Sequence, residues 1–195
     1  MKSSSGRSPL ARFVLAVLAW LPVTFAVWYF AAPLILWPAT LLTDLVARAG
    51  FGDLVTAVEQ NAAVVTFATS LKAGQAIVGG VVAVEVNALL YSFGLPMFAA
   101  LTLAAHEPHW LRALAIGYAV LVPAIAWGVL ADFLKNIAIT AAPQVASQAG
   151  FSPIQRELIV FAFQFGSLIL PTVAPAIVWV LMHRGFLERI RRVAA

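Results

Sequence analysis

Three short polar segments carry the side chains that could do chemistry in this mostly apolar chain. The residues in them that we single out as candidates for binding a partner or substrate are Glu85, Asn87, Tyr91, Trp127, Asp132, Lys135 and Gln164. Glu85 and Asn87 share a face if they lie on a strand, and that face could bind a peptide or a headgroup. A carboxylate can also act as a general acid or base. One hypothesis is therefore a membrane enzyme acting on lipid or peptide, with Asp132 or Glu85 in that role.

Each segment also has a structural explanation, which we favour. Asn87 is suited to cap a helix that begins at Ala88. Asp132 and Lys135 are three residues apart, so they occupy neighbouring positions on one helical face and can form an ion pair. Gln164 is expected to hydrogen-bond another helix from inside a membrane crossing.

Several classes of catalytic site have no counterpart in the sequence. The chain contains no cysteine, which excludes a thiol nucleophile, a disulfide and a thiolate metal site of its own. His106 and His109 flank Glu107 and Pro108 without a third convergent ligand, so no metal site is predicted. The motifs of nucleotide-binding loops, zinc helices and serine elbows are missing. We predict no catalytic residues, no metal and no cofactor.

The composition indicates a membrane protein. Hydrophobic residues make up 63% of the 195 residues and charged residues only 10%, against about 25% charged in a soluble domain. The basic residues lie at the ends of apolar stretches, which is typical of contact with lipid headgroups and not with nucleic acid. The expected fold is mainly α, one polytopic membrane domain with the lipid bilayer as its first partner.

Apolar stretches divide the chain into about four crossings. The predicted segments are a tail over 1–12, a first crossing within 13–49, further crossings over 88–105, 111–134 and 157–182, and a basic tail over 183–195. The first stretch exceeds the roughly 20 residues that a crossing needs. Because Pro22, Pro33 and Pro38 disrupt helices, we expect the crossing to occupy 13–36 and an interfacial helix to occupy 38–49.

Residues 50–87 predict a small antiparallel β-meander between the first two crossings. Larger side chains alternate with small or polar ones from Val65 to Leu71, as in a half-buried strand. Residues 59–61 and 72–75 resemble turns, and Gly79-Gly80 is a hairpin signal. The sheet must lie outside the hydrocarbon, because an open edge facing lipid would leave backbone groups unpaired.

The distribution of basic residues predicts the orientation. With four crossings, eight lysines and arginines share a side with both chain ends, and four lie on the other side. The bias favours cytoplasmic N- and C-termini in a bacterial inner membrane, with the sheet on the periplasmic side.

Several segments together resemble the exosortase H-associated membrane proteins of bacteria. They are Trp20-Leu21-Pro22 with residues 25–34, Glu85 to Tyr91 with Gly94-Leu95-Pro96, Trp127 to Lys135, and Leu170 to Pro175. The resemblance covers most of the chain apart from its extreme termini and residues 136–152.

The resemblance implies a partner of an exosortase-type system, which sorts exported proteins bearing a C-terminal motif, membrane helix and basic cluster. The sorting enzyme of such systems is thought to be a cysteine transpeptidase, and this chain has no cysteine. The favoured hypothesis is therefore a non-catalytic accessory or scaffold subunit that contacts a cognate exosortase and its substrate tail. A small transporter is a further alternative, disfavoured by the few intramembrane charges.

Overall fold

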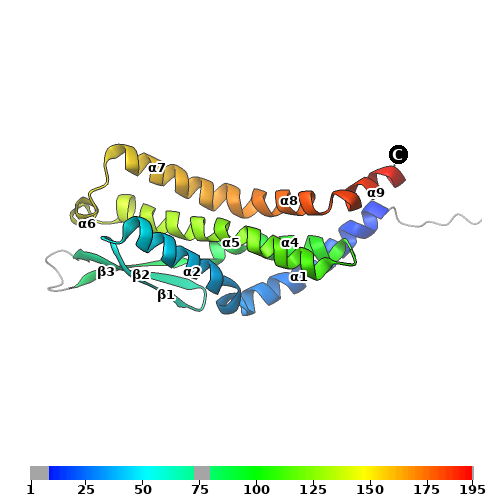
Figure 1. Ribbon diagram of the computed structural model, residues 1–195, viewed down its shortest axis with the longest axis horizontal. Helices are drawn as coiled ribbons and strands as arrows, with labels where there is room; N and C mark the ends of the chain where they lie inside the picture. The colour runs from blue at the N-terminus through cyan, green and yellow to red at the C-terminus, as the bar shows by residue number, and fades with distance from the viewer. Residues whose placement is uncertain (1–8, 73–79, 195) are drawn as a thin grey trace, which may run out of the picture.

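A computed structural model describes residues 9–72 and 80–194 as an elongated group of helices with one small sheet at one end (Figure 1). The helices are α1 (Pro9–Phe30), α2 (Ala32–Phe51), α3 (Leu89–Ser92), α4 (Gly94–Ala104), α5 (Trp110–Lys135), α6 (Pro143–Gln148), α7 (Pro153–Gln164), α8 (Leu170–Met182) and α9 (Arg184–Ala194). Two π-helical turns, η1 (Asn136–Thr140) and η2 (Phe165–Ile169), follow α5 and α7.

The chain runs the length of an elongated molecule four times. α1 and α2 lead away from one end, and the sheet occupies the other end (Figure 1). α3 and α4 return, α5 goes out again, and α7 and α8 come back to α9. The start of α1 and the whole of α9 therefore lie together, at the end opposite the sheet.

Among the described residues, four helices are long and apolar enough to cross a membrane, which matches the predicted number. They are Leu10–Phe30, Ala32–Phe51, Trp110–Thr140 and Pro153–Met182. The assignment of the second crossing needs correction. Residues 88–105 form a shorter apolar helix, Leu89–Ala104, and the sheet lies between the second and third long helices instead of the first and second.

The first apolar stretch breaks earlier than predicted. α1 ends at Phe30 and α2 begins at Ala32, ahead of the boundary expected near residue 36. Pro33 explains the position of the break. It has no N–H to donate, and its ring would collide with a carbonyl of the preceding helical turn. As the second residue of α2 it costs little, since N–H groups of a first turn have no helical partner. Pro38 lies within α2 and does not end it.

The predicted antiparallel meander is present. β1 (Val55–Asn61), β2 (Val64–Lys72) and β3 (Val81–Asn87) pair in the order β1-β2-β3. One face of β2 is buried, and Phe67 on that face stacks on Phe133 of α5 with ring centroids 4.2 Å apart. The sheet thus closes one half of the hydrophobic core together with α2 and α5.

The predicted turn at residues 59–61 is wrong. Those residues continue β1 and pair with residues 64–66 of β2. The chain reverses one step later, at Ala62, whose φ of 54° is left-handed. Cross-strand pairing outweighs the low strand propensity of the polar residues. The other predicted reversals, at 72–75 and 79–80, fall largely on residues 73–79, outside the described part of the chain.

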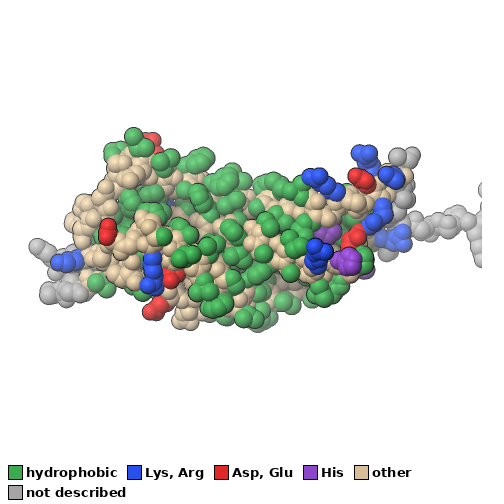
Figure 2. Space-filling model, in the orientation of Figure 1, with side chains coloured by type: hydrophobic (Ala, Val, Ile, Leu, Met, Phe, Trp, Pro, Cys, Tyr) green, Lys and Arg blue, Asp and Glu red, His purple; other side chains and the backbone are tan. Residues whose placement is uncertain are grey.

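The surface divides into an apolar middle and two charged ends. Figure 2 shows hydrophobic side chains over the central part of the visible face, with lysines, arginines and acids gathered towards either end. α1 has 22 residues, which corresponds to about 33 Å and matches a hydrocarbon layer about 30 Å thick.

Candidate functional site

A polar cluster lies where α5 meets α3 and α7. Asp132 is 9% exposed. It forms an ion pair with Lys135, with 2.9 Å between Asp132 Oδ1 and Lys135 Nζ. Asn136 Nδ2 donates to the same oxygen over 3.2 Å. The Tyr91 side chain of α3 lies near this carboxylate. The buried charge is therefore compensated by an ammonium group and an amide donor of its own helix stretch, as a buried carboxylate requires.

The same stretch of α5 is attached to α7. The Lys135 ammonium lies 4.6 Å from the centre of the Phe163 ring, a cation–π arrangement. Nearer the start of α5, Trp127 Nε1 donates to the carbonyl of Ala162 on α7 over 3.1 Å. η1 begins directly after Lys135 and η2 directly after Gln164. π turns of this kind occur frequently at functional sites.

Two glycines let the helices of this cluster touch. A Cβ on Gly128 would come within 2.4 Å of the Tyr91 ring, and one on Gly166 would lie 3.1 Å from the Gly128 Cα. Tyr91, α5 and η2 therefore pack against one another at backbone distance, as small residues permit in membrane helices.

We expect Gly128→Ala to lower the free energy of unfolding by about 1–3 kcal/mol, because the new methyl group collides with the base of the Tyr91 ring. Thermal unfolding in detergent measures the change. Gly185→Ala is the matched control, since a Cβ there meets nothing within 4 Å. Equal melting temperatures for the two variants would contradict the close packing at Gly128.

The remaining candidates lie apart from the cluster. Glu85 is exposed on the outer face of the sheet, opposite Thr66, which in turn pairs with Glu59. Asn87 Oδ1 accepts the N–H of Leu89 over 3.1 Å at the start of α3, so the predicted capping interaction is present. Glu85 and Asp132 face different sides of the sheet and do not form a carboxylate pair.

Gln164 does not make the hydrogen bond between helices that we expected. Its side chain is exposed and has no hydrogen-bond partner among residues 9–72 and 80–194. It lines an open hollow of about 300 Å³ beside Arg156, Glu157 and Phe161. Position on α7 explains the difference, because Phe163, and not Gln164, is the residue that contacts Lys135 of α5.

A second feature is an apolar groove at the break between α1 and α2. Its volume is about 520 Å³. α4 supplies residues such as Leu95 and Ala99, α1 supplies Val23 and Val27, and α5 supplies Tyr118. Val27 is 58% exposed, so the groove is open at the side. It lies within the apolar middle of the molecule.

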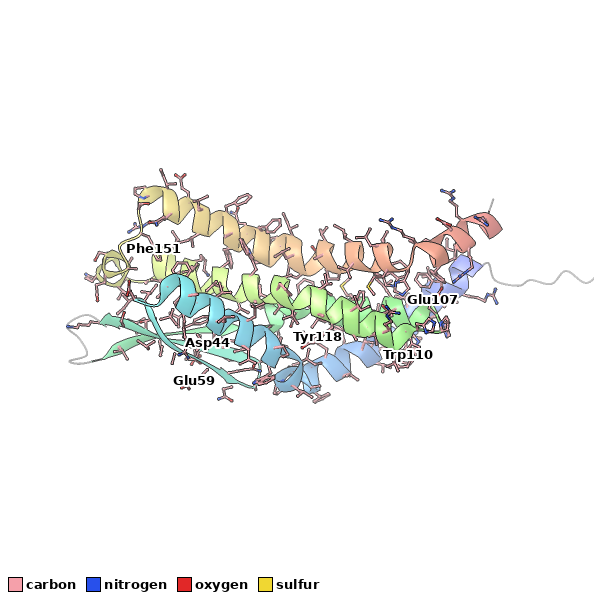
Figure 3. The ribbon with its side chains drawn as sticks, in the orientation of Figure 1. Asp44, Glu59, Glu107, Trp110, Tyr118 and Phe151 are labelled. Carbon is pink, nitrogen blue, oxygen red and sulfur yellow. The ribbon has the colours of Figure 1, made fainter. Side chains whose placement is uncertain are left out.

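Two hydrogen bonds fix the shape of this groove. The Tyr118 hydroxyl donates to the carbonyl of Ile35 over 2.7 Å, tying α5 to the first turn of α2 (Figure 3). Trp28 Nε1 donates to Ser92 Oγ over 3.1 Å, tying the end of α1 to α3. Both bonds give a partner to polar groups that could not form a hydrogen bond with lipid hydrocarbon.

The family comparison agrees with this architecture. A family model described as exosortase H-associated membrane protein matches residues 7–186. The chain belongs to this family. Comparisons with curated proteins and with solved structures gave no match.

In this exosortase H-associated protein, some of the candidate binding residues chosen from the sequence lie close together. Tyr91, Asp132 and Lys135 form one cluster, and Trp127 braces it against α7. Among the described residues, no group of three or more His, Asp or Glu side chains could hold a metal ion. The cluster holds helices together, and its charges are already paired.

Sequence reasoning missed Trp28, Ser92, Tyr118 and Asn136. Tyr118 had a signal, because it is a hydroxyl-bearing side chain in the middle of the apolar run 111–134. A polar group in that position needs a partner, but the sequence did not indicate that the partner is the carbonyl of Ile35, 83 positions away. The Trp28–Ser92 bond joins residues 64 positions apart and had no such signal.

Proposed function

We propose that this protein is a non-catalytic accessory subunit of a bacterial exosortase-type sorting system. It lies in the inner membrane with both chain ends in the cytoplasm. The apolar groove at the α1–α2 break, in a chain of this family, is the observation that carries the proposal. We infer that the groove receives side chains from a transmembrane helix of the cognate exosortase.

The size and lining of the groove support this role. An α-helix with its side chains is about 10 Å across. A volume of about 520 Å³ accommodates a few large side chains of a passing helix and not a whole helix. The exposed wall residues Val23 and Val27 offer surface to such a partner. Helices in membranes associate by this kind of close packing.

The proposed orientation rests on the distribution of charges. Arg12, at the start of α1, and the arginines of α9 lie at the end opposite the sheet. Cytoplasmic ends of membrane helices carry such an excess of basic residues. The sheet and the outer-face residues Glu59 and Glu85 then lie on the periplasmic side.

Filling the groove tests the proposal. We expect Ala99→Phe to reduce co-purification with the cognate exosortase about tenfold, because the new ring occupies the space that a partner side chain needs. Ile177→Phe on α8 is the control, since Ile177 is 52% exposed and lies outside the groove. Melting temperatures of both variants should match that of the unchanged protein.

Two outcomes would oppose this role. Undiminished association of a well-folded Ala99→Phe variant would exclude the groove as the contact. A photoreactive side chain at position 27 provides the second test. If it cross-links a substrate's tail helix and not the exosortase, the groove binds the substrate instead of the enzyme.

The periplasmic sheet is a second surface open to test. Deleting the sheet, residues 54–86, would also remove Phe67 and Val65 from the hydrophobic core and so would not test the surface alone. Glu85→Arg changes the outer face without touching that core. Unchanged association in this variant would leave the groove as the sole contact under test.

A further inference from the structure

The end of the molecule that holds the start of α1 and α9 contains a pocket that the proposed function does not use. It has a volume of about 420 Å³ and lies between the first turns of α1, the end of α4 and α9. Arg12 and His106 provide its polar rim. Ala16, Ala104, Phe186 and Ile190 provide apolar lining.

The rim carries one cation, Arg12, without a protein counterion, and one histidine. In the described part of the chain, Arg12 makes no ion pair. His106 Nδ1 lies 2.8 Å from the carbonyl of Ala104, an acceptor, so Nδ1 carries the proton and Nε2 has no partner among the described residues. His106 also has a left-handed φ of 51°, as residues directly after the C-cap of a helix commonly do, and this bend turns the chain at the end of α4.

The charge around the pocket is strongly positive. Within the described chain this end carries the six arginines Arg12, Arg112, Arg184, Arg189, Arg191 and Arg192, against Glu107 and Glu188. Glu107 is already paired with Arg189 of α9 (Figure 3). An anionic ligand is therefore favoured over a neutral or cationic one.

The position of α9 indicates where the pocket lies relative to the membrane. α9 begins directly after α8 leaves the apolar middle, and it presents Phe186, Leu187 and Ile190 inwards while its arginines are exposed. A basic amphipathic helix of this kind lies at the boundary of headgroups and acyl chains. Along α1, Arg12, Ala16 and Trp20 follow at four-residue spacing on one face, so the cationic rim gives way to apolar surface within one turn.

We propose that this pocket binds one anionic phospholipid of the cytoplasmic leaflet. The phosphate lies against Arg12 and His106, and the acyl chains extend along α1 beside Ala16 and Ala104. A free phosphate ion satisfies the rim but leaves the apolar lining exposed, whereas a phospholipid uses both. The site is separate from the α1–α2 groove, and its test does not depend on the exosortase.

Native mass spectrometry of the full chain from nanodiscs tests the proposal. The nanodiscs contain phosphatidylcholine alone or mixed with phosphatidylglycerol. We expect one phosphatidylglycerol to be retained in preference to phosphatidylcholine, and Arg12→Gln to reduce its retention about fivefold. The double variant Arg12→Gln/His106→Gln should lose more. Arg112→Gln is the control, because Arg112 is an exposed arginine at the same end that does not line the pocket.

Three outcomes would overturn the site. Equal losses in Arg12→Gln and Arg112→Gln would indicate diffuse attraction to the membrane surface. Displacement of phosphatidylglycerol by inorganic phosphate would indicate recognition of the phosphate alone. Equal retention of the two lipids by the unchanged protein would show no anionic preference. Unchanged melting temperatures of the variants guard against loss through unfolding.

Discussion

Replacing Phe67 with alanine is expected to lower the free energy of unfolding by about 3–5 kcal/mol. Phe67 is 0% exposed and stacks on Phe133, which is also 0% exposed, with ring centroids 4.2 Å apart. Truncation removes the buried ring and leaves a cavity that the packed helices cannot fill. For a chain of this size the melting temperature in detergent should fall on the order of 10 °C.

The neighbouring residue provides the control. Thr66 lies on the outer face of β2, so Thr66→Ala should change stability by less than about 0.5 kcal/mol. A double-mutant cycle with Phe133→Ala isolates the stacking. We expect the two losses to be less than additive by about 0.5–1.5 kcal/mol. Fully additive losses would show that the two rings are buried independently.

The consequence of this contact is a rigid sheet. Phe67 fixes β2 to α5, and α5 also carries Tyr118 at the groove and Asp132 at the polar cluster. Hydrogen exchange in β1 and β3 should therefore rise in Phe67→Ala while exchange near Tyr118 changes less, because the groove lies in the other half of α5.

The sequence predicted features that depend on local patterns. The apolar stretches over 111–134 and 157–182, the alternation from Val65 to Leu71 and the three-residue spacing of Asp132 and Lys135 are all visible within short windows. Each corresponds to an observed long helix, strand or ion pair. The stretch over 88–105 forms only a shorter helix, and the first stretch contains two long helices. Local periodicity carries this information because it repeats over several turns or residues.

α2 shows where local patterns were insufficient. The prolines predicted that a crossing ends near residue 36 and that an interfacial helix occupies 38–49. The helix instead runs from Ala32 to Phe51, through Pro38, and is long and apolar enough to cross a membrane. Burial of Leu36 and Ala47 in the core with the sheet stabilises it, and Arg48 pairs with Asp44 over 2.6 Å. Tertiary packing decided the outcome.

The candidate site divides in the same way. The Asp132–Lys135 pair was predictable, because both residues lie on one helix. The packing of Tyr91 against Gly128 joins α3 to α5, and the approach of Gly128 to Gly166 joins α5 to η2. Contacts of this kind depend on how helices cross, which spacing along one helix does not encode.

Removing the carboxylate of the polar cluster is the second large prediction. We expect Asp132→Ala to destabilise the protein by about 3 kcal/mol, because Lys135 and Asn136 lose their shared partner. The side chains of Lys135 and Asp132 are only 24% and 12% exposed, so water replaces the lost bonds poorly. Chemical unfolding in mild detergent measures the loss.

A double replacement separates a structural role from a functional one. Asp132→Leu/Lys135→Met removes both charges and keeps apolar volume, so it should recover most of the stability lost in Asp132→Ala. If the pair only holds α5 in place, association with the exosortase recovers with stability. If Asp132 acts directly on a substrate, stability recovers and function does not. The second result would favour the enzyme hypothesis, because a hydrophobic pair can replace the packing of a carboxylate but cannot transfer its proton.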